Sequence, residues 1–283
     1  MISTTGTAQI ARSLDGTAIG YQTLGAGEGL IVLGGAWSSG RDYLPFARAM
    51  SRSFAVHVVD RRGRGDSGPQ GENYCIDREL EDLFAVQEQT HATIVFGHSY
   101  GGLIALQAAS RAQAFSDVLA YEPGVSVGGS IPLAWMTPYR RLVAAGDRRG
   151  AFAAMVRGAG GAPPALERMP LWYVKLILRL SIPEHQWQRI DPLLETALAE
   201  HQQVAALDEP TTARYRTVSA RTVLLGGGKS RSDFTTRPFN ALTAAIPNCT
   251  TDIIAGLDHT APDHKAPRLV AERVQHQLRT SRA

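Results

Sequence analysis

Short apolar runs alternate with longer segments of helical spacing along the first 121 residues. Runs typical of buried strands lie at 29–33, 54–59, 93–96 and 118–121. Apolar residues recur at helical spacing over 42–51, 77–90 and 102–109. Asp77 is the expected N-cap of the second helix, and Asp15-Gly16 predicts an opening hairpin between two strands. This alternation predicts a mostly parallel sheet with helices on both faces.

The pattern changes between Gly124 and Thr217, where strand signals vanish. Clustered aromatic residues and proline breaks predict several short helices there. The alternation then returns, with strands at 221–225 and 251–254 and helices at 239–246 and 267–278. We therefore predict a core formed by residues 1–124 and 218–283, and a helical lid inserted at 125–217.

The segment Gly97-His98-Ser99-Tyr100-Gly101 reads G-x-S-x-G and lies between a predicted strand and a predicted helix. In a chain with 28 glycines such a motif can arise by chance. The strand–turn–helix context, however, is the one that a nucleophile elbow requires. The glycines permit a strained turn, and the turn holds Ser99 at the positive end of the following helix. Ser99 is therefore the candidate nucleophile.

Composition narrows the class of protein. The 283 residues, 44% of them hydrophobic, allow one large domain or one domain with an insertion. The net charge of +3 is mild, and its densest group, at 60–64, reads as a structural turn paired with acids, so we expect no nucleic-acid partner. The two cysteines, Cys75 and Cys249, are expected to be free thiols. With neither a signal-like N-terminus nor a membrane-spanning run, we expect a cytoplasmic monomer or homodimer without a membrane partner.

Two local patterns imitate cofactor or metal sites. Residues 63–68 match G-x-G-x-x-G after a strand, but Pro69 prevents the helix that a dinucleotide site needs. Two Asp-His pairs occur at 258–264, but Pro262 breaks any helix that would align them as ligands. We expect no cofactor and no metal.

Four motifs, taken together and in this order, resemble the α/β-hydrolase family: Gly34-Gly35-Ala36-Trp37, Asp60-Arg61-Arg62-Gly63-Arg64-Gly65-Asp66-Ser67, the Ser99 turn, and Gly256-Leu257-Asp258-His259. The resemblance implies an α/β-hydrolase fold with a helical lid and a nucleophile–acid–histidine order along the chain. It implies His259 as the general base, with His264 as the alternative. The backbone N–H groups of Ala36 and Tyr100 would form the oxyanion hole. Serine at the nucleophile position argues against epoxide opening and halide displacement, for which relatives use aspartate.

The acid of the catalytic set is not at its usual place. In the family it follows the strand at 221–225, in a turn of the form G-x-x-D, but here that turn ends in Ser230. Two carboxylates can replace it: Glu122, at the end of an earlier strand, and Asp233, in the same loop as Ser230. Both belong to the carboxyl edge of the sheet, where open α/β folds bind ligands. Asp258, or no acid at all, remains the other possibility, and Glu122 is preferred.

Three further residues are candidates for substrate binding: Trp37, His98 and Trp135. Trp37 follows the oxyanion-hole segment and either walls the acyl pocket or packs in the core. The predicted function is a serine hydrolase acting on an ester, thioester or related acyl bond of a largely apolar small molecule. The alternatives are a lyase or cyclase that reuses Ser99 and His259, and a ligand receptor without catalysis.

Overall fold

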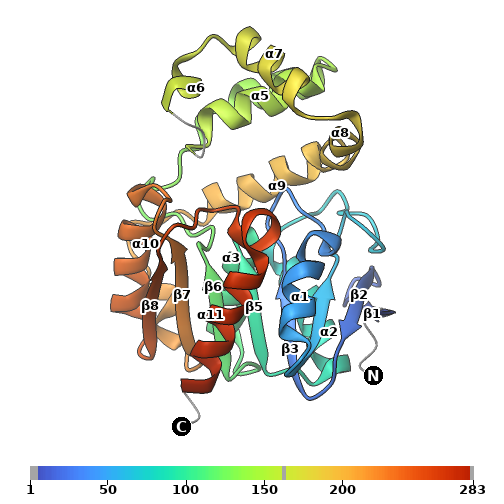
Figure 1. The fold of residues 1–283 in the computed structure, drawn as a ribbon, viewed down its shortest axis with the longest axis vertical. Coiled ribbons are helices and arrows are strands. Elements are labelled where there is room, and N and C mark those ends of the chain that lie inside the picture. The colour runs from blue at the N-terminus through green and yellow to red at the C-terminus, as the bar shows by residue number, and fades with distance from the viewer. Residues whose placement is uncertain (1–5, 161–163, 281–283) are drawn as a thin grey trace.

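The computed structural model describes residues 6–160 and 164–280, and these contain one eight-stranded sheet (Figure 1). The spatial order is β1-β2-β4-β3-β5-β6-β7-β8. β1 and β2 are antiparallel, β2 is antiparallel to β4, and all later neighbours are parallel. The strands are β1 (Thr7–Arg12), β2 (Ala18–Leu24), β3 (Glu28–Leu33), β4 (Phe54–Val59), β5 (Ile94–His98), β6 (Asp117–Tyr121), β7 (Arg221–Gly227) and β8 (Cys249–Ile254).

Helices cover both faces of this sheet, as the alternating pattern predicts. One face packs against α1 (Leu44–Met50) and α11 (Pro267–Thr280). The other packs against α2 (Ile76–Thr90), α3 (Tyr100–Arg111) and α10 (Ser232–Ala245). Every residue of β5 and β6 is buried, because these central strands have a helical layer on each side.

Between β6 and β7 the chain is mainly helical, and we call residues 125–217 of this segment the cap. Its helices are α4 (Met136–Ala144), α5 (Arg148–Gly158), α6 (Pro164–Arg168), α7 (Leu171–Ser181), α8 (Glu184–Ile190), α9 (Leu193–Ala206) and the short η2 (Ala213–Thr217). Within its described residues, the cap's β pairing is one isolated bridge, Val127 with Glu209. Figure 1 shows α9 crossing over one edge of the sheet, with α5 to α8 farther out.

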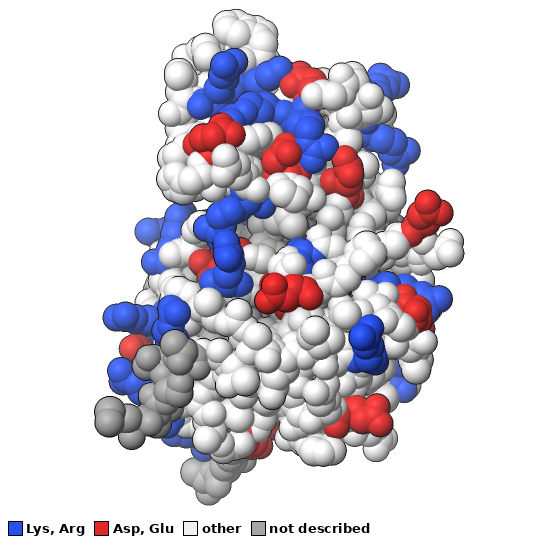
Figure 2. All heavy atoms as spheres, turned by 90° about the vertical axis from the view of Figure 1, so that its right-hand side faces the viewer, with Lys and Arg blue, Asp and Glu red and all other residues white. Residues whose placement is uncertain are grey.

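The surface of the cap carries mixed charge. Figure 2 shows basic side chains gathered over the upper part of one face, with acidic side chains between them. The cap helices also form ion pairs with one another, including Arg148 with Asp191, Arg149 with Glu184, and Lys175 with Asp147. No helix among the described residues has both the length and the apolar composition needed to cross a bilayer.

Two expected helix starts were wrong. α2 begins at Ile76 with Cys75 as its N-cap, so Asp77 lies in the first turn, where a carboxylate still interacts favourably with the helix dipole. The helix expected from Phe239 begins at Ser232 and runs through Pro238. Proline normally breaks a helix because it lacks an N–H donor, but this helix packs on the sheet through Phe239 and Leu242 and continues.

Candidate active site

Ser99 lies in a strained turn between β5 and α3. Its φ is 53° and its ψ −117°, a conformation that few non-glycine residues adopt. The flanking glycines are needed because of close backbone approaches. A Cβ at Gly97 would lie 2.3 Å from the carbonyl oxygen of Gly101, and one at Gly101 would lie 2.4 Å from that of Leu33. The G-x-S-x-G pattern is therefore a packing requirement of this turn.

Two backbone N–H groups of the predicted oxyanion hole belong to residues that line the same cavity as Ser99, namely Ala36 and Tyr100. Tyr100 is the first residue of α3, so its N–H has no acceptor within the helix. The loop that carries Ala36 runs close beside the serine: a Cβ at Gly35 would lie 3.3 Å from the Cβ of Ser99. The Gly35 N–H donates to the Tyr43 hydroxyl at 2.9 Å, which anchors this loop.

Glu122 and His259 form a hydrogen-bonded pair. The Nδ1 atom of His259 lies 2.8 Å from Oε2 of Glu122. Glu122 is buried, follows β6 directly, and has a φ of 42°. Its Oε1 atom accepts hydrogen bonds from the Gly227 N–H at 2.7 Å and from the Ser230 hydroxyl at 2.6 Å. With both of its oxygens bonded, the carboxylate is fixed in orientation.

This pair determines the protonation state of His259. Burial lowers the pKa of the imidazole, but the hydrogen bond and charge of Glu122, together with the charges of Asp263 and Asp258, raise the pKa above its usual value of 6.5. The carboxylate acceptor keeps a proton on Nδ1, so in the neutral ring Nε2 is the acceptor. His259 and Ser99 line the same cavity, and 46% of the histidine side chain is exposed there. A neutral imidazole in this tautomer has the basic nitrogen that general-base catalysis requires.

The other described candidates, Asp258 and His264, form different contacts, although Asp258 also lines the cavity. Asp258 accepts from the Thr260 hydroxyl at 2.8 Å and pairs with Lys265. The side chain of Asp233 lies outside the described part of the structure. His264 lines a second cavity, of about 580 Å³, together with Trp37 and other mainly polar residues. Among the described candidate acids, Glu122 is thus the carboxylate that contacts His259.

The expected substrate-binding role of His98 was wrong. Its side chain is buried and is not part of the cavity lining. Nδ1 lies 2.7 Å from the Tyr43 hydroxyl, and Nε2 lies 2.8 Å from the backbone oxygen of His259. Burial lowers the pKa of His98 well below 6.5, and the nearby His259 lowers it further, so the ring is neutral. His98 therefore links the elbow to the loop that carries His259.

The cavity has a volume of about 910 Å³, in the range of small-molecule sites. Trp37 and Trp135 both line it, and their rings pack against Tyr139. Its other apolar lining comes mainly from the cap: Ile131, Pro132, Met155 and Val204. Its basic lining residues are Arg168, Lys229, Arg231 and Lys265.

Sequence reasoning missed the functional meaning of Ser230. We expected an acid there and interpreted its absence as a departure, but the Ser230 hydroxyl donates to Glu122. The end of β7 thus supports the carboxylate that β6 supplies. The signal was present, because a small hydroxyl residue stood where a relocated carboxylate would need a donor.

A model of the alpha/beta hydrolase family matches residues 30–273. A solved alpha/beta hydrolase from Sphaerobacter thermophilus is 30% identical, with a TM-score of 0.77, covering 93% of this chain and 99% of that one. A proline iminopeptidase of Saccharolobus solfataricus is 31% identical over 44% of this chain and 40% of its own length. A pimeloyl-[acyl-carrier protein] methyl ester esterase of Aliivibrio salmonicida is 33% identical over 34% of this chain and 36% of its own. The chain thus matches about two fifths of the length of these two curated relatives.

Proposed function

Since this chain belongs to the alpha/beta hydrolase family, we propose that it is a serine hydrolase that cleaves an ester, thioester or related acyl bond. The observation that carries the proposal is the His259–Glu122 hydrogen bond beside a cavity that Ser99 also lines. A serine hydroxyl becomes a useful nucleophile only when a positioned base accepts its proton. The buried carboxylate gives His259 both the tautomer and the basicity for that step.

In the proposed reaction, Ser99 Oγ attacks the acyl carbon while Nε2 of His259 takes the hydroxyl proton. The N–H groups of Ala36 and Tyr100 stabilise the oxyanion of the tetrahedral intermediate. Collapse of this intermediate breaks the bond to the leaving group, which receives the proton from His259. Water, activated by the same histidine, then hydrolyses the acyl-enzyme, and a carboxylic acid leaves.

The cavity supports a substrate with a largely apolar part. The two tryptophans and the aliphatic residues that line it offer apolar contact area, beside the basic side chains that line the same cavity. The cap helices that contribute these residues would also exclude water from the reacting bond.

Labelling with a fluorophosphonate probe tests this proposal. Intact-mass measurement should show one added phosphonyl group on the native protein and none on Ser99→Ala, because the probe reacts with activated serines. A known serine esterase, treated in parallel, controls for probe quality. The proposal is overturned if that esterase gains mass and the native chain does not.

A further inference from the structure

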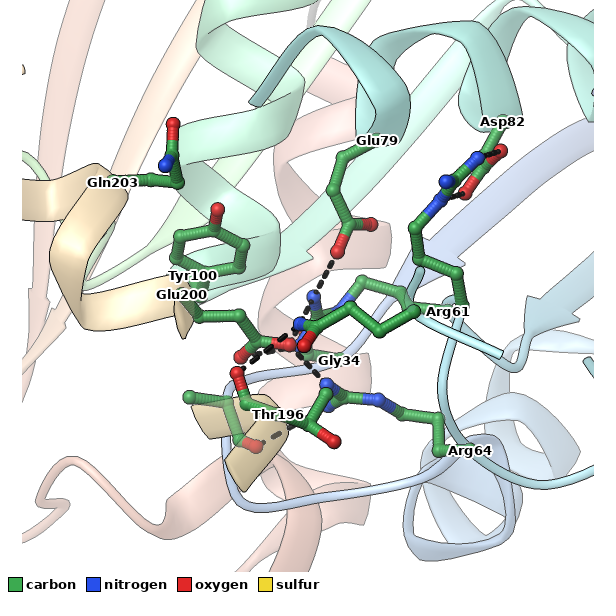
Figure 3. Close-up of polar contacts among 12 residues, drawn as sticks. Gly34, Arg61, Arg64, Glu79, Asp82, Tyr100, Thr196, Glu200 and Gln203 are labelled. Carbon is green, nitrogen blue, oxygen red and sulfur yellow. Dashed lines mark hydrogen bonds and ion pairs between the residues drawn. The ribbon is translucent and has the colours of Figure 1, made fainter. Parts of the chain in front are cut away.

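Two arginines and two glutamates form a buried cluster behind the oxyanion-hole loop: Arg61, Arg64, Glu79 and Glu200 (Figure 3). Their exposed fractions are between 0% and 5%. Arg61 Nη1 lies 2.7 Å from Oε1 of Glu79 and 2.9 Å from Oε1 of Glu200. Arg64 pairs with the same Glu200 oxygen. Burial opposes the charge on Arg61, but Glu200 and Glu79 hold its pKa well above the usual value.

The guanidinium groups of this cluster donate to the backbone of the oxyanion-hole loop. Arg61 donates through Nε to the Gly34 oxygen at 3.0 Å and through Nη2 to the Gly35 oxygen at 2.9 Å. Arg64 donates through Nη1 to three oxygens of the same loop, at 3.2, 3.2 and 3.0 Å: those of Gly35, Ala36 and Ser38. The Gly35 oxygen is therefore shared by both arginines.

The Gly35 oxygen belongs to the same peptide unit as the Ala36 N–H. A trans peptide is planar, and its N–H points away from its carbonyl oxygen. Two cationic donors on that oxygen therefore fix the direction in which the Ala36 N–H points. They also polarise the peptide, because hydrogen bonds in a low-dielectric interior strengthen one another. Arg61 also contacts the residue that supplies the second predicted N–H donor, since its guanidinium lies 5.0 Å from the centre of the Tyr100 ring.

Glu200 connects this loop to the cap. It lies on α9 and is separated from Arg61 by 139 positions in the sequence. It contacts both guanidinium groups, whereas the ion pair of Glu79, on α2, is with Arg61. Without Glu200, Arg64 would lose its carboxylate partner inside the protein, where an unpaired charge is strongly disfavoured. The position of Arg64, and with it that of the Gly35 oxygen, therefore depends on α9.

We propose that Arg61, Arg64 and Glu200 are positioning residues that orient the Ala36 N–H toward the oxyanion, so that cap helix α9 determines whether the oxyanion hole is formed. This inference rests on the serine hydrolase function proposed above. The described hydrogen bonds of the cluster reach neither Ser99 nor His259, so the cluster acts through the oxyanion-hole loop. Its effect is therefore expected on the stability of the transition state.

The test is Glu200→Gln, which keeps the size of the side chain and removes its charge. We expect kcat on a p-nitrophenyl ester to fall at least tenfold, with KM within threefold, since loss of one oxyanion donor costs about 10²–10³ in kcat. Affinity for a trifluoromethyl ketone, which forms an oxyanion with the serine, should fall by a similar factor. The acid limb of the pH–rate profile should not move, because the His259–Glu122 pair is unchanged.

Arg64→Lys is the second variant, for the case that Glu200→Gln does not fold. It keeps the buried charge balance, but a single ammonium group cannot reproduce a planar fork that spans the loop oxygens and Glu200. We expect the same loss of kcat and of ketone affinity.

Asp82→Asn is the matched control. Asp82 forms the neighbouring buried pair with Arg62, through two contacts of 2.7 Å, and the described hydrogen bonds of the Arg62 side chain go to Asp82 and Asp15. This variant should lower the thermal midpoint as the other two do, but leave kcat and ketone affinity within twofold of the wild type.

Two results overturn the inference. One is a folded Glu200→Gln or Arg64→Lys protein with kcat and ketone affinity within twofold of the wild type. The other is a fall in kcat of equal size in Asp82→Asn, which would make the effect one of general destabilisation. A wild type that neither turns over esters nor reacts with the fluorophosphonate would instead overturn the proposed function itself.

Discussion

Replacing Glu122 with glutamine should remove nearly all turnover while leaving the fold in place. In the native site, one carboxylate oxygen accepts from Nδ1 of His259, and the other accepts from the Gly227 N–H and the Ser230 hydroxyl. A glutamine has one oxygen, which cannot serve both the Nδ1–H of His259 and the two donors at and just after the end of β7. With the oxygen toward β7, the amide NH₂ faces the imidazole.

The histidine must then accept a hydrogen bond at Nδ1, which moves its own proton to Nε2. In this tautomer Nε2 cannot take the proton of Ser99. If the glutamine amide were rotated by half a turn, its NH₂ group would lie 2.7 Å from the Gly227 nitrogen, with two donors facing each other. This orientation is therefore also unfavourable. Disturbing the tautomer in a serine–histidine–acid set costs about 10⁴-fold in kcat, or ~5 kcal/mol of transition-state stabilisation.

The assay is kcat on a p-nitrophenyl ester for Glu122→Gln, Asp233→Asn and Ser230→Ala, with thermal midpoints as a check on folding. Ser230→Ala removes one hydrogen bond and keeps the carboxylate, so kcat should fall about tenfold or less. Asp233→Asn should behave as the wild type. The reasoning is refuted if Asp233→Asn abolishes turnover while Glu122→Gln stays near the wild-type rate.

Two further outcomes are expected. The raised pKa of His259 should place the acid limb of kcat/KM above pH 6.5, since the base must be deprotonated to act. In the residual activity of Glu122→Gln that limb should move to lower pH, because the charge of Glu122 that raises the pKa is then absent. A limb that stays in place on this substitution would contradict the assignment. Gly101→Ala should destabilise the fold by ~3 kcal/mol or more, because its Cβ would lie 2.4 Å from a carbonyl oxygen, whereas Gly124→Ala, with its nearest atom at 3.5 Å, should cost ~1 kcal/mol or less in denaturant unfolding. Equal losses in the two variants would show that the close approach is relieved elsewhere.

The parallel strands β3, β4, β5 and β6 were predictable because their sequences are nearly continuous apolar runs. The run at 54–59 is β4, and those at 29–33 and 118–121 differ from β3 and β6 by a single residue. The mostly parallel sheet expected from this alternation is present, and the α/β-hydrolase fold class implied by the motif resemblance is confirmed. The start of α10 was harder to predict from the sequence. Pro238 is a local helix-breaking signal, and packing of the helix against the sheet overrides it.

The candidate site was likewise predictable from the sequence only in part. Ser99 stands in a local motif, and Glu122 and His259 each follow a strand, so their juxtaposition could be expected from the topology alone. The turn at 60–64 was expected to be paired with acids, and Arg61 and Arg64 are. That one of these acids is Glu200 could not be inferred, since no local pattern marks a contact across 139 positions inside a helical segment.

The chain leaves the core just after Glu122 and re-enters it at β7, which in topology makes the cap a simple insertion. Segments of this kind are attractive units for exchange between homologues in enzyme engineering. Glu200 removes that freedom here. A graft lacking a carboxylate at the equivalent point of its last long helix would leave the Arg64 guanidinium unpaired in the interior, and Arg61 with Glu79 alone as its carboxylate partner. A chimera of this protein therefore has to keep α9 or to replace Arg64 with an apolar residue, while Arg61 keeps its pair with Glu79.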